Sequence, residues 1–143
     1  MPAAESGVRV YGEQRGAALA DYDADGRVDL VVTQNGNATK LYRNLRAKPG
    51  LRVRLEGPPG NPAAVGAVLR LLTGGRVGPA RELHAGSGYW SQDGAVTVVG
   101  STTLPSGLEV RWPGGKISRV DVPPGAVEIE VRHDGPFRSV LSP

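Results

Sequence analysis

The chain has 143 residues, of which 39% are hydrophobic and none is cysteine. This length suits one ordinary domain or a short module attached to one. The lack of cysteine excludes disulfides, thiolate nucleophiles and zinc sites of the cysteine type. The net charge of +3 is too small to indicate a nucleic-acid partner. No apolar stretch approaches the ~18 residues of a membrane span, and the first residues lack the features of a signal peptide, so we expect neither.

The composition and periodicity predict an all-β fold. With 21 glycines and 12 prolines, long helices are hard to place. Valine-rich runs alternate between apolar and polar residues and are separated by turn signals every eight to twelve residues, which is typical of a sandwich or barrel. The predicted strands cover residues 17–20, 30–33, 40–43, 51–55, 65–73, 80–85, 95–99, 108–112, 117–122 and 127–132.

The sequence pattern of the chain changes near residues 45–50. Before this point lies a short β unit with an acidic loop, and its Asn35-Gly36 pair is a strong hairpin signal. After it, strands alternate strictly, as in Leu51-Arg52-Val53-Arg54-Leu55, where the apolar residues share one face and the arginines the other. We therefore expect one unit over residues 1–45 and a second, β-sandwich-like domain over residues 46–143.

The sharpest motif is the acidic loop of residues 21–29. Carboxylates stand at loop positions 1, 3, 5 and 9, as Asp21, Asp23, Asp25 and Asp29, and a glycine occupies position 6, where the chain must turn sharply. Ca²⁺ takes six to eight hard oxygen ligands and tolerates irregular geometry, whereas Mg²⁺ keeps more water. The carbonyl of Arg27 can supply position 7. The loop thus predicts a calcium site with Asp21, Asp23, Asp25, Arg27 and Asp29 as ligands.

Electrostatics favour a bound cation in this loop. Two carboxylates ~5 Å apart repel by roughly 1–3 kcal/mol, and Arg27 is the only cation within the loop sequence. An EF-hand is not expected, because position 12 is Val32 and the following residues are strand-like. The alternative is a polar turn without metal, in which the aspartates bond their own backbone.

Two segments resemble known families. Gly16 to Val32, followed by Leu41-Tyr42-Arg43-Asn44, resembles an FG-GAP/VCBS repeat, the calcium-loop blade unit of integrin-α-type β-propellers. The segments Gly86-Ser87-Gly88-Tyr89-Trp90-Ser91-Gln92 and Val110-Arg111-Trp112-Pro113-Gly114-Gly115-Lys116 resemble the ASPIC/UnbV domain of cartilage-acidic-protein-like proteins. The resemblance implies a propeller-like blade with Ca²⁺ on its loop, an extracellular or cell-surface location, and adhesion or interaction instead of catalysis. One blade cannot close a propeller of about four to eight blades.

Three further sets of residues carry alternatives. Tyr89 and Trp90 could form a stacking platform for a sugar, but tryptophan is usually buried, which favours a place in the core, as for Trp112. Arg52, Arg54, Arg70 and Arg111 could form a basic stripe for phosphates or sulfated sugars, or simply a solvated sheet face. His84, Ser87 and Asp93 include the residue types of a hydrolase triad without its Gly-x-Ser-x-Gly elbow.

The favoured function is a non-enzymatic, calcium-binding interaction or adhesion module. It would present its sheets to a protein partner and insert into no membrane. Asn37-Ala38-Thr39 is an acceptor sequence for N-glycosylation, which would matter only in a secretory pathway. The first alternative is a self-assembling filament or oligomer subunit that uses exposed β edges. The second is a carbohydrate-binding domain centred on Tyr89 and Trp90.

Overall fold

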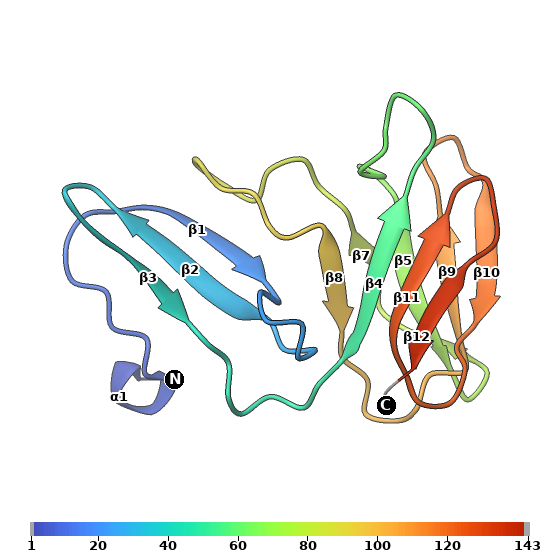
Figure 1. Cartoon of the computed structure of the whole chain (residues 1–143), viewed down its shortest axis with the longest axis horizontal. Helices are drawn as coiled ribbons and strands as arrows, with labels where there is room; N and C mark the ends of the chain where they lie inside the picture. The colour runs from blue at the N-terminus through green and yellow to red at the C-terminus, as the bar shows by residue number, and fades with distance from the viewer. Residues whose placement is uncertain (1, 142–143) are drawn as a thin grey trace.

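The computed structural model describes residues 2–141, and its regular secondary structure consists almost entirely of strands, so the predicted all-β class is confirmed (Figure 1). One short helix, α1 (Ala3–Ser6), precedes them. Among the described residues, no helix is long and apolar enough to cross a membrane. The strands are β1 (Gln14–Ala20), β2 (Asp29–Gln34), β3 (Asn37–Tyr42), β4 (Leu51–Glu56), β5 (Val68–Thr73), β6 (Arg76–Val77), β7 (Arg81–Glu82), β8 (Val96–Val99), β9 (Gly107–Arg111), β10 (Ile117–Asp121), β11 (Ala126–Arg132) and β12 (Arg138–Leu141).

The strands form three sheets. The first sheet is antiparallel, with the order β1-β2-β3. The second sheet has the order β10-β9-β5-β6, with β7 also paired to β5, and the third has the order β12-β11-β4-β8. In the third sheet β4 pairs in parallel with β11 and antiparallel with β8, and the chain crosses to the second sheet both between β4 and β8 and between β8 and β11. Figure 1 shows the first sheet on the left, beside the two layers formed by the others.

The first sheet follows its sequence signals closely. β2 and β3 are joined at Asn35-Gly36, where Gly36 has a φ of 65°, so the predicted hairpin is confirmed. β1 pairs with β2 in a register that places Ala17 opposite Val32 and Ala20 opposite Asp29. The acidic loop therefore closes the end of the β1–β2 pair, which fixes where its carboxylates lie.

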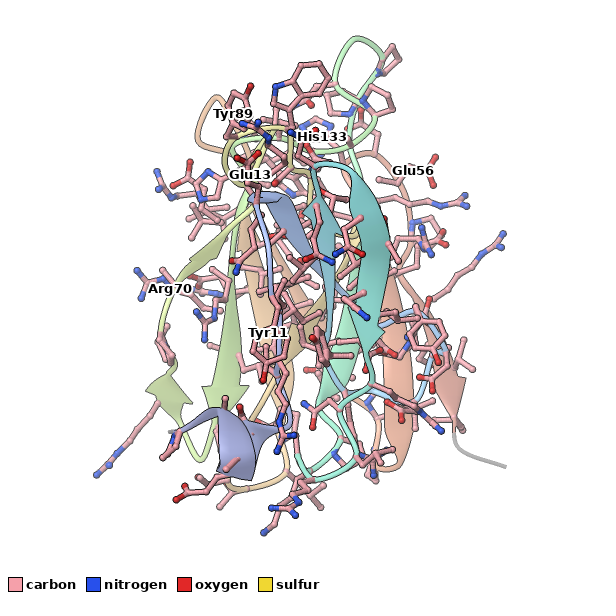
Figure 2. The ribbon with its side chains drawn as sticks, turned by 90° about the vertical axis from the view of Figure 1, so that its left-hand side faces the viewer. Tyr11, Glu13, Glu56, Arg70, Tyr89 and His133 are labelled. Atoms are coloured by element: carbon pink, nitrogen blue, oxygen red, sulfur yellow. The ribbon has the colours of Figure 1, made fainter. Side chains whose placement is uncertain are left out.

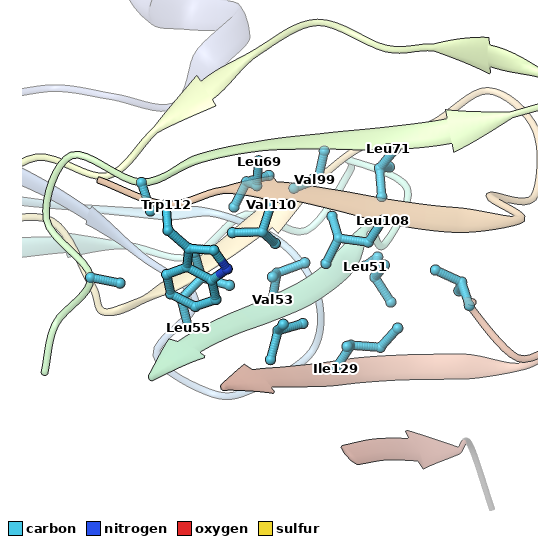
Figure 3. Close-up of a cluster of buried hydrophobic side chains, with 14 residues drawn as sticks. Leu51, Val53, Leu55, Leu69, Leu71, Val99, Leu108, Val110, Trp112 and Ile129 are labelled. Atoms are coloured by element: carbon cyan, nitrogen blue, oxygen red, sulfur yellow. The ribbon is translucent and has the colours of Figure 1, made fainter. Parts of the chain in front are cut away.

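The hydrophobic core lies between the second and third sheets (Figure 3). Strict alternation in β4, β5, β9 and β11 aims one face of each strand inward, as period-2 patterning requires. Trp112 is 1% exposed, and its indole Nε1 donates to Ser118 Oγ at 2.9 Å, so its predicted place in the core is confirmed. Full burial of each large aliphatic side chain contributes about 1.5–3 kcal/mol. The core includes Leu51, Val53, Leu55, Leu69, Leu71, Leu108, Val110, Ile129 and Val131.

Several predicted boundaries are wrong. Residues 65–67 belong to a turn instead of the predicted strand 65–73, because the Asn61 side chain bonds both the N–H and the C=O of Val65. The strand predicted over 80–85 shortens to the two residues of β7. Arg52 does not lie on a solvated face: it is 9% exposed, and its guanidinium bonds Asp21 of the acidic loop and Glu128 of β11.

A loop of the later domain covers the free edge of β1. Ser91 Oγ accepts a hydrogen bond from Ala17 N–H at 3.0 Å, and Asp93 Oδ1 accepts one from Leu19 N–H at 2.8 Å. Gly94 N–H in turn donates to the carbonyl of Leu19 at 2.8 Å. A Cβ on Gly16 would lie 2.9 Å from the carbonyl oxygen of Trp90, so this approach needs a glycine. Together these contacts dock the first sheet on the rest of the chain.

Candidate metal centre

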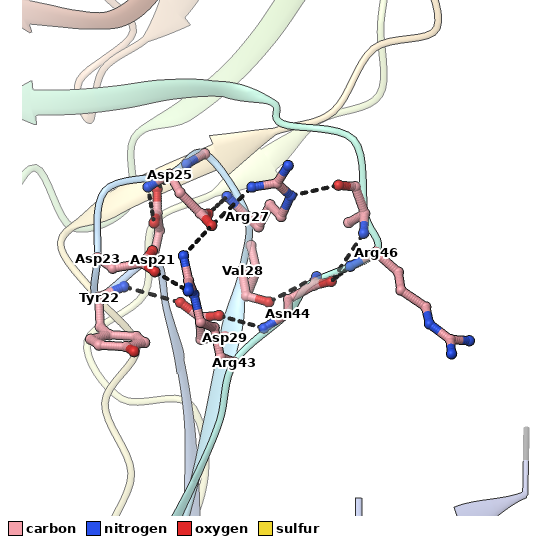
Figure 4. Close-up of polar contacts among 12 residues, drawn as sticks. Asp21, Tyr22, Asp23, Asp25, Arg27, Val28, Asp29, Arg43, Asn44 and Arg46 are labelled. Carbon is pink, nitrogen blue, oxygen red and sulfur yellow. Dashed lines mark hydrogen bonds and ion pairs between the residues drawn. The ribbon is translucent and has the colours of Figure 1, made fainter. Parts of the chain in front are cut away.

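The acidic loop turns tightly around the carboxylate of Asp21. The loop runs from the end of β1 to the start of β2, and Gly26 takes a φ of 80°, so the sharp bend predicted at position 6 is confirmed. Asp21 accepts hydrogen bonds from the backbone N–H of Asp25 at 3.0 Å and of Gly26 at 2.9 Å. This arrangement folds the chain back on itself and turns the following carboxylates toward a common centre (Figure 4).

Three of the four predicted carboxylates converge. One oxygen each of Asp21, Asp23 and Asp29 lies within 4.8 Å of the others. Asp29 is 2% exposed and accepts from Tyr22 N–H at 3.2 Å and Asn44 N–H at 2.7 Å, so its position is fixed by backbone on both sides. Hard carboxylate oxygens in a flexible loop are the ligand type that Ca²⁺ prefers. These three residues therefore form a candidate cation site in which backbone N–H groups and the guanidiniums of Arg43 and Arg52 also bond the carboxylates.

The remaining predicted carboxylate, Asp25, lies outside this group. It accepts hydrogen bonds from its neighbour Arg27, through the backbone N–H at 2.9 Å and through the guanidinium at 2.9 Å. Burial by itself raises the pKa of Asp25, but these bonds and the nearby positive charge of Arg27 and Arg43 outweigh it, so the pKa is lowered overall. Asp25 is therefore a compensated anion that would have to turn inward to become a ligand.

Two arginines from outside the loop also compensate the negative charge of its aspartates. Arg43, from just after β3, places Nε 2.6 Å from Asp23 Oδ2 and its NH2 nitrogen 3.4 Å from Asp25 Oδ2 (Figure 4). The charge of Asp23 is the main cause that raises the pKa of Arg43. Arg27 is the only cation within the loop sequence, but distant segments bring two more to the loop.

The second of these arginines, Arg52 on β4, makes the most buried ion pair at the site. It donates to Asp21, whose side chain is fully buried, and to Glu128 at 2.8 Å. Burial by itself lowers the pKa of Arg52, but the hydrogen bonds to Glu128 and Asp21 outweigh it and raise the pKa overall. Removal of one partner from such a pair leaves an uncompensated buried charge. Sequence periodicity missed this role, because strict alternation places Arg52 on an outward face.

The loop also binds the segment that links it to the sandwich. Gly50 N–H donates to the Gly26 carbonyl at 2.8 Å, and Arg27 Nε donates to the Ala47 carbonyl at 2.7 Å. A Cβ on Gly26 would lie 3.1 Å from the Gly50 oxygen. The candidate centre is thus part of the junction between the first sheet and the third, and anything that orders the loop also orders this junction.

Tyr89 and Trp90 are not core residues, so the interpretation that placed them in the core is wrong. They are 68% and 83% exposed. Their rings meet edge to face, with centroids 6.0 Å apart. Trp90 has a φ of 52°, and the surrounding turn is held by the bridge between Gly88 and Ser91. The pair is available to a ligand from solution.

The residues of the considered hydrolase triad make separate contacts. Asp93 bonds β1, as described above, and His84 Nδ1 lies 3.8 Å from Glu82 Oε1. Within residues 2–141, no hydrogen bond joins Ser87 to His84, so the geometry of a nucleophile and its base is not present. Asn37 stands exposed at the start of β3, just beyond the hairpin turn.

The comparisons with known proteins assign the later part of the chain. The sequence model of the family described as ASPIC and UnbV matches residues 57–136. This span covers the second sheet, strands β8 and β11 of the third sheet and the Tyr89–Gly94 loop, and it does not include the acidic loop. No curated protein matches the chain. Because the match covers more than half of the sequence, the chain belongs to the ASPIC and UnbV family.

Proposed function

We propose that this chain is a non-enzymatic, calcium-dependent interaction module of an extracellular or cell-surface protein. Ca²⁺ would occupy the space between Asp21, Asp23 and Asp29 and hold the first sheet at a fixed angle to the sandwich. The observation that carries the proposal is the convergence of three carboxylate oxygens within 4.8 Å at the junction of the two units. The likeness of residues 16–44 to an FG-GAP/VCBS blade unit agrees with it.

The charged residues at the junction favour a bound cation. Four aspartates of the loop are met by three arginines, Arg27, Arg43 and Arg52, so the cluster keeps a net negative charge. A divalent cation would neutralise the excess and replace the exposed pair between Arg43 and Asp23, whose arginine side chain is 51% exposed. Exposed pairs of this kind contribute little, so their exchange for metal ligands costs little.

Thermal unfolding with Ca²⁺, with Mg²⁺ and with a chelator tests the proposal. Asp23→Asn is the variant of choice, because Asp23 pairs only with Arg43 among the described residues, whereas Asp21 and Asp29 also hold backbone N–H groups. Ca²⁺ at about one hundred times its Kd stabilises a protein by about 2.7 kcal/mol. We expect Ca²⁺ to raise the Tm of the wild type by several degrees, Mg²⁺ to raise it less, and Asp23→Asn to abolish the difference.

The matched control is Asp121→Asn, which removes an exposed aspartate on β10, away from the loop. This variant should keep the full calcium response. A wild-type Tm that is the same in Ca²⁺ and in chelator would contradict the proposal. So would an equal loss of response in the two variants.

A second candidate function rests on the exposure of Tyr89 and Trp90. Two adjacent aromatic rings that face solvent on a turn anchored to β1 are suited to stack against a sugar. Trp90→Ala should then lose glycan-array signal that the wild type shows, with Tyr11→Ala, which removes another exposed aromatic residue, as the control. An array on which both variants bind like the wild type would eliminate this candidate.

A further inference from the structure

β3 forms the open edge of the first sheet. The sheet has the order β1-β2-β3, and five of the six residues of β3 are exposed. Figure 2 shows the three strands in this order, with Tyr11 of the preceding segment on the side of β1. The loop of residues 89–94 covers the edge of β1, so β3 is the edge of this sheet that a further strand can join.

The hydrogen bonds of β1 determine which backbone groups of the sheet point in which direction. The N–H groups of Ala17 and Leu19 point away from β2, because they donate to the loop that covers β1. Bonding directions alternate along an antiparallel strand, so Ala18, between these two residues, bonds its opposite residue Val31 on β2. Val31 therefore directs its backbone groups to β1, and its two neighbours on β2 direct theirs to β3.

The same alternation turns the backbone of Leu41 outward. Leu30 and Val32 lie opposite Tyr42 and Lys40, so these two residues of β3 bond β2, whereas Leu41 between them faces away from it. The register is regular over these residues, since its shift comes only after Val32. The N–H and C=O of Leu41 are therefore available to a strand added from solution.

Thr39 extends this edge toward the hairpin turn. It has no opposite residue on β2, and outside the strand ladders no hydrogen bond within residues 2–141 reaches the backbone of Thr39 or Leu41. Both side chains are exposed, that of Leu41 to 53%. Cross-strand pairs of apolar and β-branched side chains stabilise a sheet, so valine-like residues suit the positions opposite these two.

The charge of the edge selects the kind of strand that fits it. Lys40 is exposed, and among the described residues no carboxylate pairs with it, because Asp23 and Asp25 of the nearby loop bond Arg43 instead. An acidic residue opposite Lys40 would form a cross-strand ion pair, whereas a like charge there is destabilising. A second copy of β3 would bring its own Lys40 to the same edge, so the charge favours an acidic strand over pairing between copies.

We propose that β3 accepts an extended segment of a partner protein, with an acidic residue opposite Lys40 between apolar or β-branched residues opposite Thr39 and Leu41. In this mode of recognition the main-chain hydrogen bonds supply affinity, and alternate side chains supply specificity. The acidic residue and Lys40 form a pair without backbone hydrogen bonds, the kind in which side chains approach most closely. The inference rests on the proposed function as an interaction module and names the kind of partner that the module binds.

Calorimetric titration with capped six-residue peptides tests this edge. The first peptide alternates valine and glutamate, the second alternates valine and lysine, and the third is the first with N-methylated valines. We expect the glutamate peptide to bind, the lysine peptide to bind more weakly by about tenfold or more, and the N-methylated peptide not to bind, because it cannot donate to the Leu41 carbonyl.

Two pairs of variants place the binding on β3. Leu41→Pro removes the outward N–H, which an edge strand tolerates, and should weaken binding by about tenfold or more, while Leu41→Val keeps the N–H and should bind like the wild type. Lys40→Glu should weaken binding of the glutamate peptide by about three- to tenfold and strengthen that of the lysine peptide. Lys48→Glu, the same change of charge in the exposed link after β3, is the control and should change neither.

Equal binding of the N-methylated and unmethylated peptides would overturn the proposal, whether or not Leu41→Pro folds. So would equal effects of Lys40→Glu and Lys48→Glu, which would show binding to net charge alone, or pairing of copies in light scattering without peptide binding. The calcium response of the Tm, measured on the same samples, separates this inference from the proposed function. Absent peptide binding with an intact calcium response would overturn the inference alone, and peptide binding without a calcium response would contradict only the role of calcium.

Discussion

At the scale of single residues, the guanidinium of Arg43 and a metal ion would bind the same carboxylate of the candidate metal centre, that of Asp23. The guanidinium of Arg43 reaches Asp23, one of the three converging carboxylates, at 2.6 Å. Its side chain is half exposed and comes from outside the loop, so it can swing away without disturbing the fold. If Ca²⁺ binds here as we propose, Arg43 would compete with it for Asp23.

Replacement of Arg43 should accordingly strengthen calcium binding. We expect Arg43→Gln to tighten the Kd for Ca²⁺ by about two- to fivefold, because the metal no longer displaces an exposed ion pair. Fluorescence titration with a competing calcium chelator measures the change, with Arg46→Gln, an exposed arginine of the following link, as the control. Weaker calcium binding in Arg43→Gln than in Arg46→Gln would contradict this role.

The residue types and their spacing identified part of this site in advance. The loop spacing predicted that the carboxylates of Asp21, Asp23 and Asp29 converge, but the same spacing also predicted Asp25, which bonds Arg27 instead. The involvement of Arg43 and Arg52 could not be predicted, since it arises from the packing of β3 and β4 beside the loop, which are contacts between distant segments. The same limit applies to Trp90: average burial placed it in the core, whereas the local turn holds it in solvent.

At the scale of elements, the two layers of the sandwich are fastened near the end of β11. Lys116, just before β10 of the second sheet, donates to the His133 carbonyl and to Asp134 Oδ1 at 2.8 Å, both just after β11 of the third sheet. The hydrogen bond from Lys116 is the main cause that lowers the pKa of Asp134 below its ordinary value of 3.8, with the imidazole of His133 as a further cause.

This contact predicts a pH dependence with a definite sign. Because the pKa of Asp134 is lowered in the folded state, its ionised carboxylate stabilises the fold at a pH above its unfolded-state pKa. This stabilisation is lost as the pH falls through the folded-state pKa. NMR titration should give Asp134 a pKa below 3.8 in the wild type and a higher one in Lys116→Met. Lys48→Met, which removes a lysine of the link between β3 and β4, is the control, and a similar pKa in all three proteins would contradict the assignment.

The strands themselves could be predicted from the sequence where burial is one-sided. β4, β9 and β11 alternate strictly and pack against the core, so period and environment agree. β6, β7 and β12 are short or fully exposed strands, and their pairing depends on a neighbouring edge instead of on their own pattern. The parallel pairing of β4 with β11 could not be derived either, because no local signal specifies which strand a returning chain joins.

At the scale of the whole molecule, one edge of the first sheet is covered and the other is open. The loop of residues 89–94 satisfies backbone groups of β1, while β3 ends the sheet on the far side. Covered edges resist strand addition from other chains, and open edges invite it. The self-assembly alternative therefore applies to β3, and the docking of the loop on β1 decides whether a second edge becomes available.

Gly16→Val tests this docking. The new side chain would meet the carbonyl oxygens of Trp90 and Tyr89, so we expect a loss of about 1–3 kcal/mol in the free energy of unfolding. The freed edge of β1 should also increase self-association, as measured by light scattering across a concentration series. Gly100→Val, at a glycine with open space around it, is the control. Equal stability and equal mass for the two variants would show that the loop does not protect β1.

We propose that a calcium ion joins the first sheet to the sandwich, and a crystal structure grown in millimolar CaCl₂ tests this proposal. The predicted result is one ion at about 2.3–2.6 Å from oxygens of Asp21, Asp23 and Asp29, with the guanidinium of Arg43 displaced from Asp23. A site in the same crystals that holds water alone, or in which Arg43 still bonds Asp23, would contradict the account.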